Sequence, residues 1–77
     1  MKEVIKTMRE WLRQLRRKNS HTQAALSERL EISQNYYSSI ENGERQKDLD
    51  LSLVIKLAKI FGVSVDYIIA EEEKLRG

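Results

Sequence analysis

The sequence predicts an all-α fold in which five short helices enclose one hydrophobic core. Apolar residues recur every three or four positions along most of the chain, and helix-capping residues stand before most of these patterns. No segment has the strict alternation of apolar and polar residues that is typical of a strand. At 77 residues, of which 40% are hydrophobic, the chain has room for a single core. We therefore expect residues 1–77 to form one compact domain.

The first helix is predicted over residues 3–18, and Asn19-Ser20 ends it. Its apolar stripe consists of Ile5, Met8, Leu12 and Leu15, broadened by Val4 and Trp11. Because the stripe is broad, Val4 and Trp11 have two possible places. They could pack on the last helix of the same chain or against a second chain.

The next segment has the pattern of a helix-turn-helix over residues 22–43. Its elements are helices over 23–30 and 34–42 and a tight turn at Glu31-Ile32. Thr22 and Ser33 stand where a side-chain oxygen can cap each helix. The inner faces carry Leu26, Leu30, Tyr37 and Ile40. Gly43 ends the second helix because glycine readily takes the left-handed conformation.

Two further helices complete the predicted fold. The fourth helix follows its cap, Asp50, and runs through Phe61. Its apolar face consists of Leu51, Val54, Ile55, Leu57, Ala58 and Phe61. Ser64 caps a fifth helix over residues 65–70, whose apolar residues are Val65, Ile68 and Ile69. Residues 71–77 are expected to form a flexible tail.

Composition and charge narrow the possible functions. The chain has 14 basic and 12 acidic residues, a net charge of +2, and its first helix carries a basic group. This group consists of Arg9, Arg13, Arg16, Arg17 and Lys18. With one histidine, no cysteine and no glycine-rich phosphate loop, we expect no enzyme activity, metal site or cofactor. No apolar run suits a signal peptide or a membrane span, so we expect a cytoplasmic protein without membrane contact.

The outward face of the 34–42 helix carries short polar side chains. They are Gln34, Asn35, Ser38 and Ser39. Amides and hydroxyls of this kind can hydrogen-bond base edges in the major groove, and glutamine and asparagine suit adenine. We interpret these residues as candidate base contacts. The alternative is an ordinary solvated helix face.

In these features the sequence resembles the Cro and phage-repressor family of helix-turn-helix DNA-binding domains, also called the XRE family. The matching motifs are Gln23, Glu41-Asn42-Gly43, Leu57-Ala58-Lys59 and Gly62-Val63-Ser64-Val65-Asp66, between about Leu12 and Ile69. The resemblance implies a compact five-helix, lambda-repressor-like fold whose third helix lies in the major groove. It also implies that Gln23 binds a phosphate and that Arg16 and Glu41 form a structural salt bridge. The full set of expected phosphate contacts is Gln23, Tyr36, Asn42, Arg45 and Lys47.

Three features depart from the family pattern. Glu31 stands in the turn where glycine is usual, and a positive φ there would cost on the order of 1 kcal/mol. Ser20 and His21 replace a glycine and an apolar residue, which predicts a looser first turn. The loop after the third helix is longer than the common form and lacks its proline.

The resemblance implies a sequence-specific DNA-binding transcriptional regulator. Within this class we expect a repressor that binds a two-fold operator as a homodimer. The candidate dimer surfaces are Trp11 in the first helix and Tyr67 with Ile69 in the last. Two alternatives stay open. One is a DNA-binding antitoxin with a partner protein, and the other is a helical protein-interaction module with weak DNA contact.

Overall fold

The structure, a computed structural model, describes residues 8–76. These residues contain five helices joined by loops, and no strand occurs among them. They are α1 (Glu10–Lys18), α2 (Gln23–Leu30), α3 (Gln34–Glu41), α4 (Leu51–Phe61) and α5 (Val65–Arg76). The prediction of an all-α, five-helix fold is confirmed. Within the same residues, no helix is long and apolar enough to cross a lipid bilayer.

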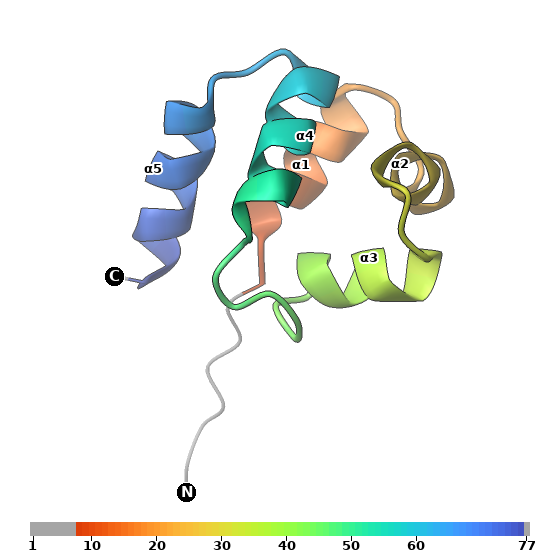
Figure 1. The fold of residues 1–77 in the computed structure, drawn as a ribbon, viewed down its shortest axis with the longest axis horizontal. Coiled ribbons are helices and arrows are strands. Elements are labelled where there is room, and N and C mark those ends of the chain that lie inside the picture. The colour runs from red at the N-terminus through yellow and green to blue at the C-terminus, as the bar shows by residue number, and fades with distance from the viewer. Residues whose placement is uncertain (1–7, 77) are drawn as a thin grey trace, which may run out of the picture.

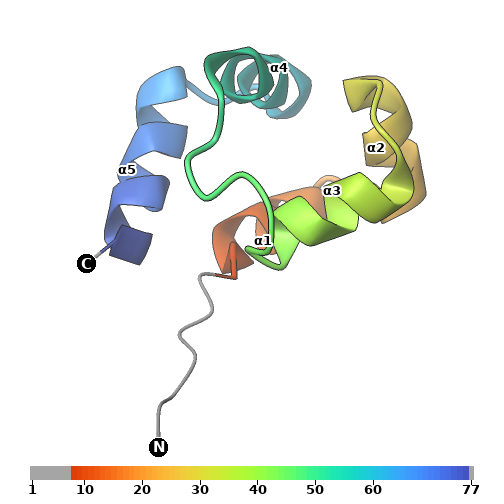
Figure 2. The same ribbon diagram turned by 60° about the horizontal axis from the view of Figure 1, so that its bottom comes forward.

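The helices are arranged so that α3 lies along one edge of the molecule. In Figure 1 it runs along the lower edge with α2 beside one end, and Figure 2 brings it toward the viewer. α2 and α3 pack on each other, α1 contacts α3, and α4 contacts both α2 and α5. In both views the loop over residues 42–50 runs between α3 and α5. One side of α3 is therefore covered and the other faces outward.

The starts of four helices are fixed by side-chain caps, as the sequence predicts. Thr22 Oγ1 and Ser33 Oγ accept from the backbone N–H groups of Ala25 and Tyr36, both at 3.0 Å. Asp50 Oδ1 accepts from Leu53 N at 2.8 Å, and Ser64 Oγ accepts from Tyr67 N at 3.0 Å. Each cap satisfies a backbone donor that has no partner within the helix. The predicted starts of α2, α3, α4 and α5 are therefore confirmed.

The first helix begins later than predicted. α1 starts at Glu10, and Arg9 before it has φ −85° and ψ 75°, outside the helical range. The backbone N–H of Arg9 donates instead to the carbonyl oxygen of Glu41 in α3, at 2.9 Å. This bond draws the chain out of the helical path. Residues 3–7 of the predicted helix, which include Val4, lie outside the described residues.

The last helix is longer than predicted. α5 continues to Arg76, so the prediction of a flexible tail over 71–77 is wrong for residues 71–76. Leu75 packs against the core, and the Glu72 carboxylate accepts hydrogen bonds from two side chains of the N-terminal part of the chain. These tertiary contacts hold helical turns that would fray in isolation. Gly77 lies outside the described residues.

The core contains apolar residues from all five helices. They are Trp11, Leu12, Leu26, Leu30, Tyr37, Ile40, Leu53, Val54, Leu57, Ala58, Phe61 and Ile68. Trp11 is 8% exposed, and its Nε1 donates to Glu72 Oε2 at 2.8 Å. Of the two places considered for Trp11, the structure therefore shows packing against the last helix of the same chain. The hypothesis that Trp11 forms a dimer surface is wrong.

Three residues predicted to face the core are exposed instead. Leu51 is 68% exposed, Ile55 is 38% exposed and Ile69 is 46% exposed. Leu51 and Ile55 lie one turn apart on the outer side of α4, whose inner side presents Val54 to the core. Ile69 follows the fully buried Ile68, so it points to the other side of α5.

Candidate nucleic-acid interface

The outward face of α3 presents the side chains predicted to contact bases. Gln34 and Asn35 in the first turn are exposed, and Ser38 and Ser39 are half-buried. Ser39 Oγ donates to the carbonyl oxygen of Asn35 at 3.0 Å, so its proton is used within the helix and its oxygen is left as an acceptor. Each exposed amide offers both donors and an acceptor. This face can therefore both donate and accept hydrogen bonds.

The inner side of α3 ends in a buried carboxylate that joins three helices. Glu41 is 3% exposed and accepts bidentate hydrogen bonds from Arg16, from Nε to Oε2 at 2.8 Å and from Nη2 to Oε1 at 3.2 Å. Tyr37 Oη donates to Oε2 at 2.7 Å, and Gln23 Nε2 donates to Oε1 at 2.9 Å. We call these four residues the Glu41 cluster. It contains the salt bridge that the family resemblance implies.

The charges of the Glu41 cluster hold one another in place. Burial by itself would raise the pKa of Glu41, but the hydrogen bonds from Arg16, Tyr37 and Gln23 together lower it below its usual value. The hydrogen bond to Glu41 raises the pKa of Arg16. Burial, with the same carboxylate, raises the pKa of Tyr37. Near neutral pH the cluster is therefore an anion, a cation and two neutral donors, which fixes α3 against α1 and α2.

Gln23, the predicted phosphate contact at the start of α2, belongs to this cluster. Its side chain is half-buried, and one N–H of its amide is bonded to Glu41. An amide also carries a second N–H, and the first backbone N–H groups of a helix favour an anion. Glu41 thus sets the orientation of Gln23. Its contact with a phosphate stays a prediction.

The start of the 42–50 loop folds back onto the outward face of α3. The Arg45 guanidinium lies 5.8 Å from the centroid of the Tyr36 ring, and Gln46 Nε2 donates to Tyr36 Oη at 2.7 Å. One shallow hollow is lined by Ser33, Asn35, Tyr36, Ser39 and Arg45. Candidate base contacts and candidate phosphate contacts are therefore neighbours here. Tyr36 keeps its own hydroxyl proton for a further acceptor.

Two other phosphate candidates lie outside this hollow. Asn42 is half-buried directly after α3, where its backbone N–H donates to the carbonyl oxygen of Ser38 at 2.9 Å. Lys47 is exposed farther along the loop. The structure thus places all five phosphate candidates at the ends of α2 and α3 or on the adjoining loop, without testing any contact.

A second buried arginine was not identified as a site residue from the sequence. Arg9 is 2% exposed, and it donates from Nε to Glu72 Oε2 at 2.9 Å and from Nη2 to Oε1 at 3.0 Å. Its Nη1 donates to the carbonyl oxygen of Ile40 at 2.8 Å. Further acceptors are the carbonyl oxygens of Arg45, Gln46 and Lys47. We call Arg9, Trp11 and Glu72 the Arg9 cluster, because Trp11 shares the same carboxylate.

The predicted basic group of the first helix is therefore divided. Arg9 and Arg16 are buried and paired, whereas Arg17 is exposed. Positions 9, 12 and 16 follow the i, i+3, i+7 spacing of one helix face, on which Leu12 is a core residue. The register of Arg9 with Leu12 is thus the one feature of the sequence that could have singled it out.

The departures from the family pattern are accommodated locally. Ser20 and Glu31 take positive φ values of 61° and 64°, and Glu31 does so in the turn where the sequence predicts it. The His21 ring packs edge-on against Phe61 with centroids 5.7 Å apart. The backbone carbonyl oxygen of His21 accepts a hydrogen bond from Arg16 Nη1 at 3.1 Å. The prediction of a looser first turn is wrong, because His21 fills the apolar place. No group of three His, Cys, Asp or Glu in the described part of the chain is placed to hold a metal ion.

A capped helix pair joined by a tight turn, with polar side chains outward on its second helix, defines a helix-turn-helix domain of the DNA-binding class. The pattern of the helix-turn-helix family matches residues 12–68, and the chain belongs to this family.

Two curated proteins are similar to most of the chain. The HTH-type transcriptional regulator ImmR of Bacillus subtilis is 34% identical over 62 residues, which are 80% of this chain and 47% of ImmR. The HTH-type transcriptional regulator RamB of Mycobacterium tuberculosis is 32% identical over 62 residues, which are 80% of this chain and 13% of RamB. The matched residues therefore span less than half the length of either relative. No solved structure matches the chain significantly.

Proposed function

We propose that this chain is a sequence-specific DNA-binding transcriptional regulator that acts as a repressor. The observation that carries the proposal is the exposed first turn of α3, where Gln34 and Asn35 face outward from a helix whose inner side is held by Glu41. The two relatives are named as transcriptional regulators, which supports the same function. A domain seated in the major groove excludes other proteins from the same base pairs, so repression needs only occupancy of the site.

The site residues divide into two roles. Gln34, Asn35, Ser38 and Ser39 would contact base edges from the outward face of α3. Gln23, Tyr36, Asn42, Arg45 and Lys47 would contact phosphates on either side of it. Direct base contacts from the amides favour adenine in the bound sequence. The phosphate contacts fix how α3 sits in the groove.

Selection of bound sequences from a random duplex pool tests this function. We expect an enriched half-site containing adenine, repeated with two-fold symmetry at a spacing of about one DNA turn. Recovery of sequences without any preference would contradict sequence-specific binding. Affinity without salt dependence would contradict DNA binding through phosphates.

The same proposal includes a homodimer on a two-fold operator. One recognition helix contacts too few base pairs to select a site in a genome, and two copies double that number. α5 carries the candidate interface, since Tyr67 is 40% exposed and Ile69 is 46% exposed.

Sedimentation equilibrium with and without a palindromic duplex tests the dimer. We expect Ile69→Glu to weaken self-association, whereas Leu51→Glu, the same kind of change on the outer side of α4, leaves it unaltered. A wild-type protein that stays monomeric on a saturated palindromic site would contradict the dimer.

A further inference from the structure

The Arg9 cluster lies outside the part of the chain that the family pattern covers. Arg9 precedes and Glu72 follows the matched residues 12–68, and the two are paired across 63 positions of sequence. The contact therefore joins two residues that lie on either side of the matched pattern. Its buried guanidinium reaches into the loop that carries two candidate phosphate contacts, Arg45 and Lys47.

Hydrogen bonds from both side chains and backbone hold the 42–50 loop in its conformation. Gln46 has a positive φ of 56°, and its side chain accepts from Asp50 N at 3.0 Å and donates to Asp50 Oδ2 at 3.1 Å. The backbone N–H groups of Glu44 and Arg45 donate to the carbonyl oxygen of Ser39. Arg9 then binds the carbonyl oxygens of three successive residues, 45–47. A loop that has no proline is thus held by a guanidinium.

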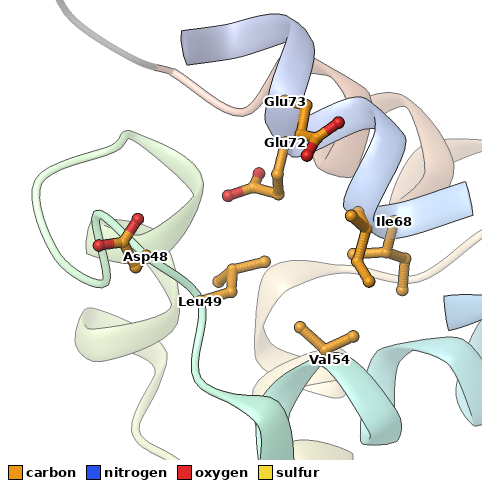
Figure 3. Close-up of a pocket in the computed structure, with 7 residues that line it drawn as sticks. Asp48, Leu49, Val54, Ile68, Glu72 and Glu73 are labelled. Carbon is orange, nitrogen blue, oxygen red and sulfur yellow. The ribbon is translucent and has the colours of Figure 1, made fainter. Parts of the chain in front are cut away.

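The far end of this loop meets α5 across a cavity. Figure 3 shows Leu49 from the loop and Ile68 and Glu72 from α5 around the same hollow, which Asp48, Val54, Ile69 and Glu73 also line. Beside this hollow, Leu49 packs against the core to which Ile68 of α5 belongs. The guanidinium of Arg9 also links the loop to α5, because it is bonded to Glu72 on one side and to loop carbonyl oxygens on the other.

We propose that Arg9, held by Glu72 of α5, is a positioning residue for DNA binding that sets the reach of Arg45 and Lys47 toward the phosphates. This inference rests on the proposed function. Its consequence is that α5, on the other side of the loop from α3, becomes a second determinant of DNA affinity (Figure 2). By reciprocity, bound DNA stabilises the pairing of Arg9 with Glu72.

The test compares Glu72→Gln with Glu73→Gln, which removes the same charge from the exposed next position of α5. The probe is a short fluorescent duplex of arbitrary sequence, since phosphate contacts do not depend on sequence. We expect Glu72→Gln to bind about 3- to 10-fold more weakly than Glu73→Gln. We also expect its plot of log affinity against log salt to be shallower by about one unit.

A cycle with the loop residues separates positioning from general stability. In a background of Arg45→Ala with Lys47→Ala, Glu72→Gln should have no further effect on affinity or on the salt slope. Amide hydrogen exchange without DNA should be faster at residues 44–48 in Glu72→Gln while α2 and α3 are unchanged. These outcomes support the inference even if Arg9→Ala itself fails to fold.

The outcomes that overturn the inference differ from those that overturn the function. If Glu72→Gln and Glu73→Gln bind alike, or if the loss persists in full in the double-alanine background, Arg9 does not act through the loop. If the wild-type chain shows no salt-dependent affinity for any duplex, the proposed function itself fails, whatever the exchange rates of the loop.

Discussion

Two buried arginines, Arg16 and Arg9, both bind the end of α3 but differ in their other partners. Arg16 is 8% exposed and pairs with Glu41, a side chain of α3 itself. Arg9 is 2% exposed and pairs with Glu72 of α5, while most of its other bonds go to loop carbonyls. Arg16 therefore fixes the helix that would contact bases, whereas Arg9 binds the end of that helix and also holds the loop that would contact phosphates. The difference indicates that sequence preference and overall affinity can be altered separately.

The largest expected effect follows from removing Arg16. Arg16→Met leaves the carboxylate of Glu41 buried without its cation, and we expect a loss of about 3 to 5 kcal/mol in the free energy of unfolding. Arg17→Met, an exposed neighbour, should change it by no more than about 0.5 kcal/mol. Thermal and urea unfolding followed by circular dichroism measure both. Equal losses at the two positions would mean that the Glu41 cluster has no special role in stability.

The Glu41 cluster should also make stability depend on pH. The folded-state pKa of Glu41 is lowered, so its contribution is complete above the ordinary glutamate value of 4.5 and is lost as the pH falls through the folded-state value. Wild type should therefore lose stability in that acidic range more steeply than Glu41→Gln. Glu28→Gln, at an exposed position of α2, should keep the wild-type slope. Parallel profiles for wild type and Glu41→Gln would contradict the assignment.

A comparison of Asn35 with Lys47 sharpens the separation of the two roles. Asn35→Ala should cost about 1 to 3 kcal/mol of binding and relax preference at one base pair. Lys47→Ala should weaken all sequences alike and reduce the salt slope by about one unit. Lys59→Ala on α4 is the matched control, because it removes the same charge from an exposed position away from the loop. An unchanged selected site in Asn35→Ala would remove Asn35 from the base contacts.

The smallest expected effect comes from the turn between α2 and α3. Glu31 has φ 64° and ψ 39°, a conformation that glycine adopts without a steric penalty. Glu31→Gly should stabilise the protein by up to about 1 kcal/mol, offset in part by the greater freedom of glycine in the unfolded chain. The exposed ion pair of Glu31 with Lys56, at 3.6 Å, adds little to the stability of the folded protein, so its loss should not cancel this gain. A drop in melting temperature would show that the turn is not strained.

The parts of the fold that follow from local chemistry were predictable from the sequence. Caps at Thr22, Ser33 and Asp50 depend on residues three positions away, and they fixed the starts of their helices. The ends of the fold were not predictable in this way. The start of α1 depends on a bond from Arg9 to Glu41, and the length of α5 depends on contacts of Glu72 with distant residues.

The candidate site shows the same limit. Polar residues on the outward face of α3 follow from helical periodicity, and the pairing of Arg16 with Glu41 follows from the family resemblance. Neither source indicates that Tyr37 and Gln23 join that carboxylate, because a sequence pattern places a residue on a face without fixing its hydrogen-bond partner. The sequence predicts Arg9 only as one member of a basic group on the first helix, and since charged side chains are normally solvated, that pattern does not indicate its burial.

The pairing of Arg9 with Glu72 also bears on the order in which the chain folds. Contacts within α2 and α3 are short in sequence, whereas this pair closes a loop across 63 positions, at a larger cost in chain entropy. We expect the pair to form after the transition state, so that Glu72→Gln accelerates unfolding and leaves the folding rate nearly unchanged in stopped-flow measurements. The lifetime of the native state would then be set by the two ends of the chain rather than by the helix-turn-helix between them.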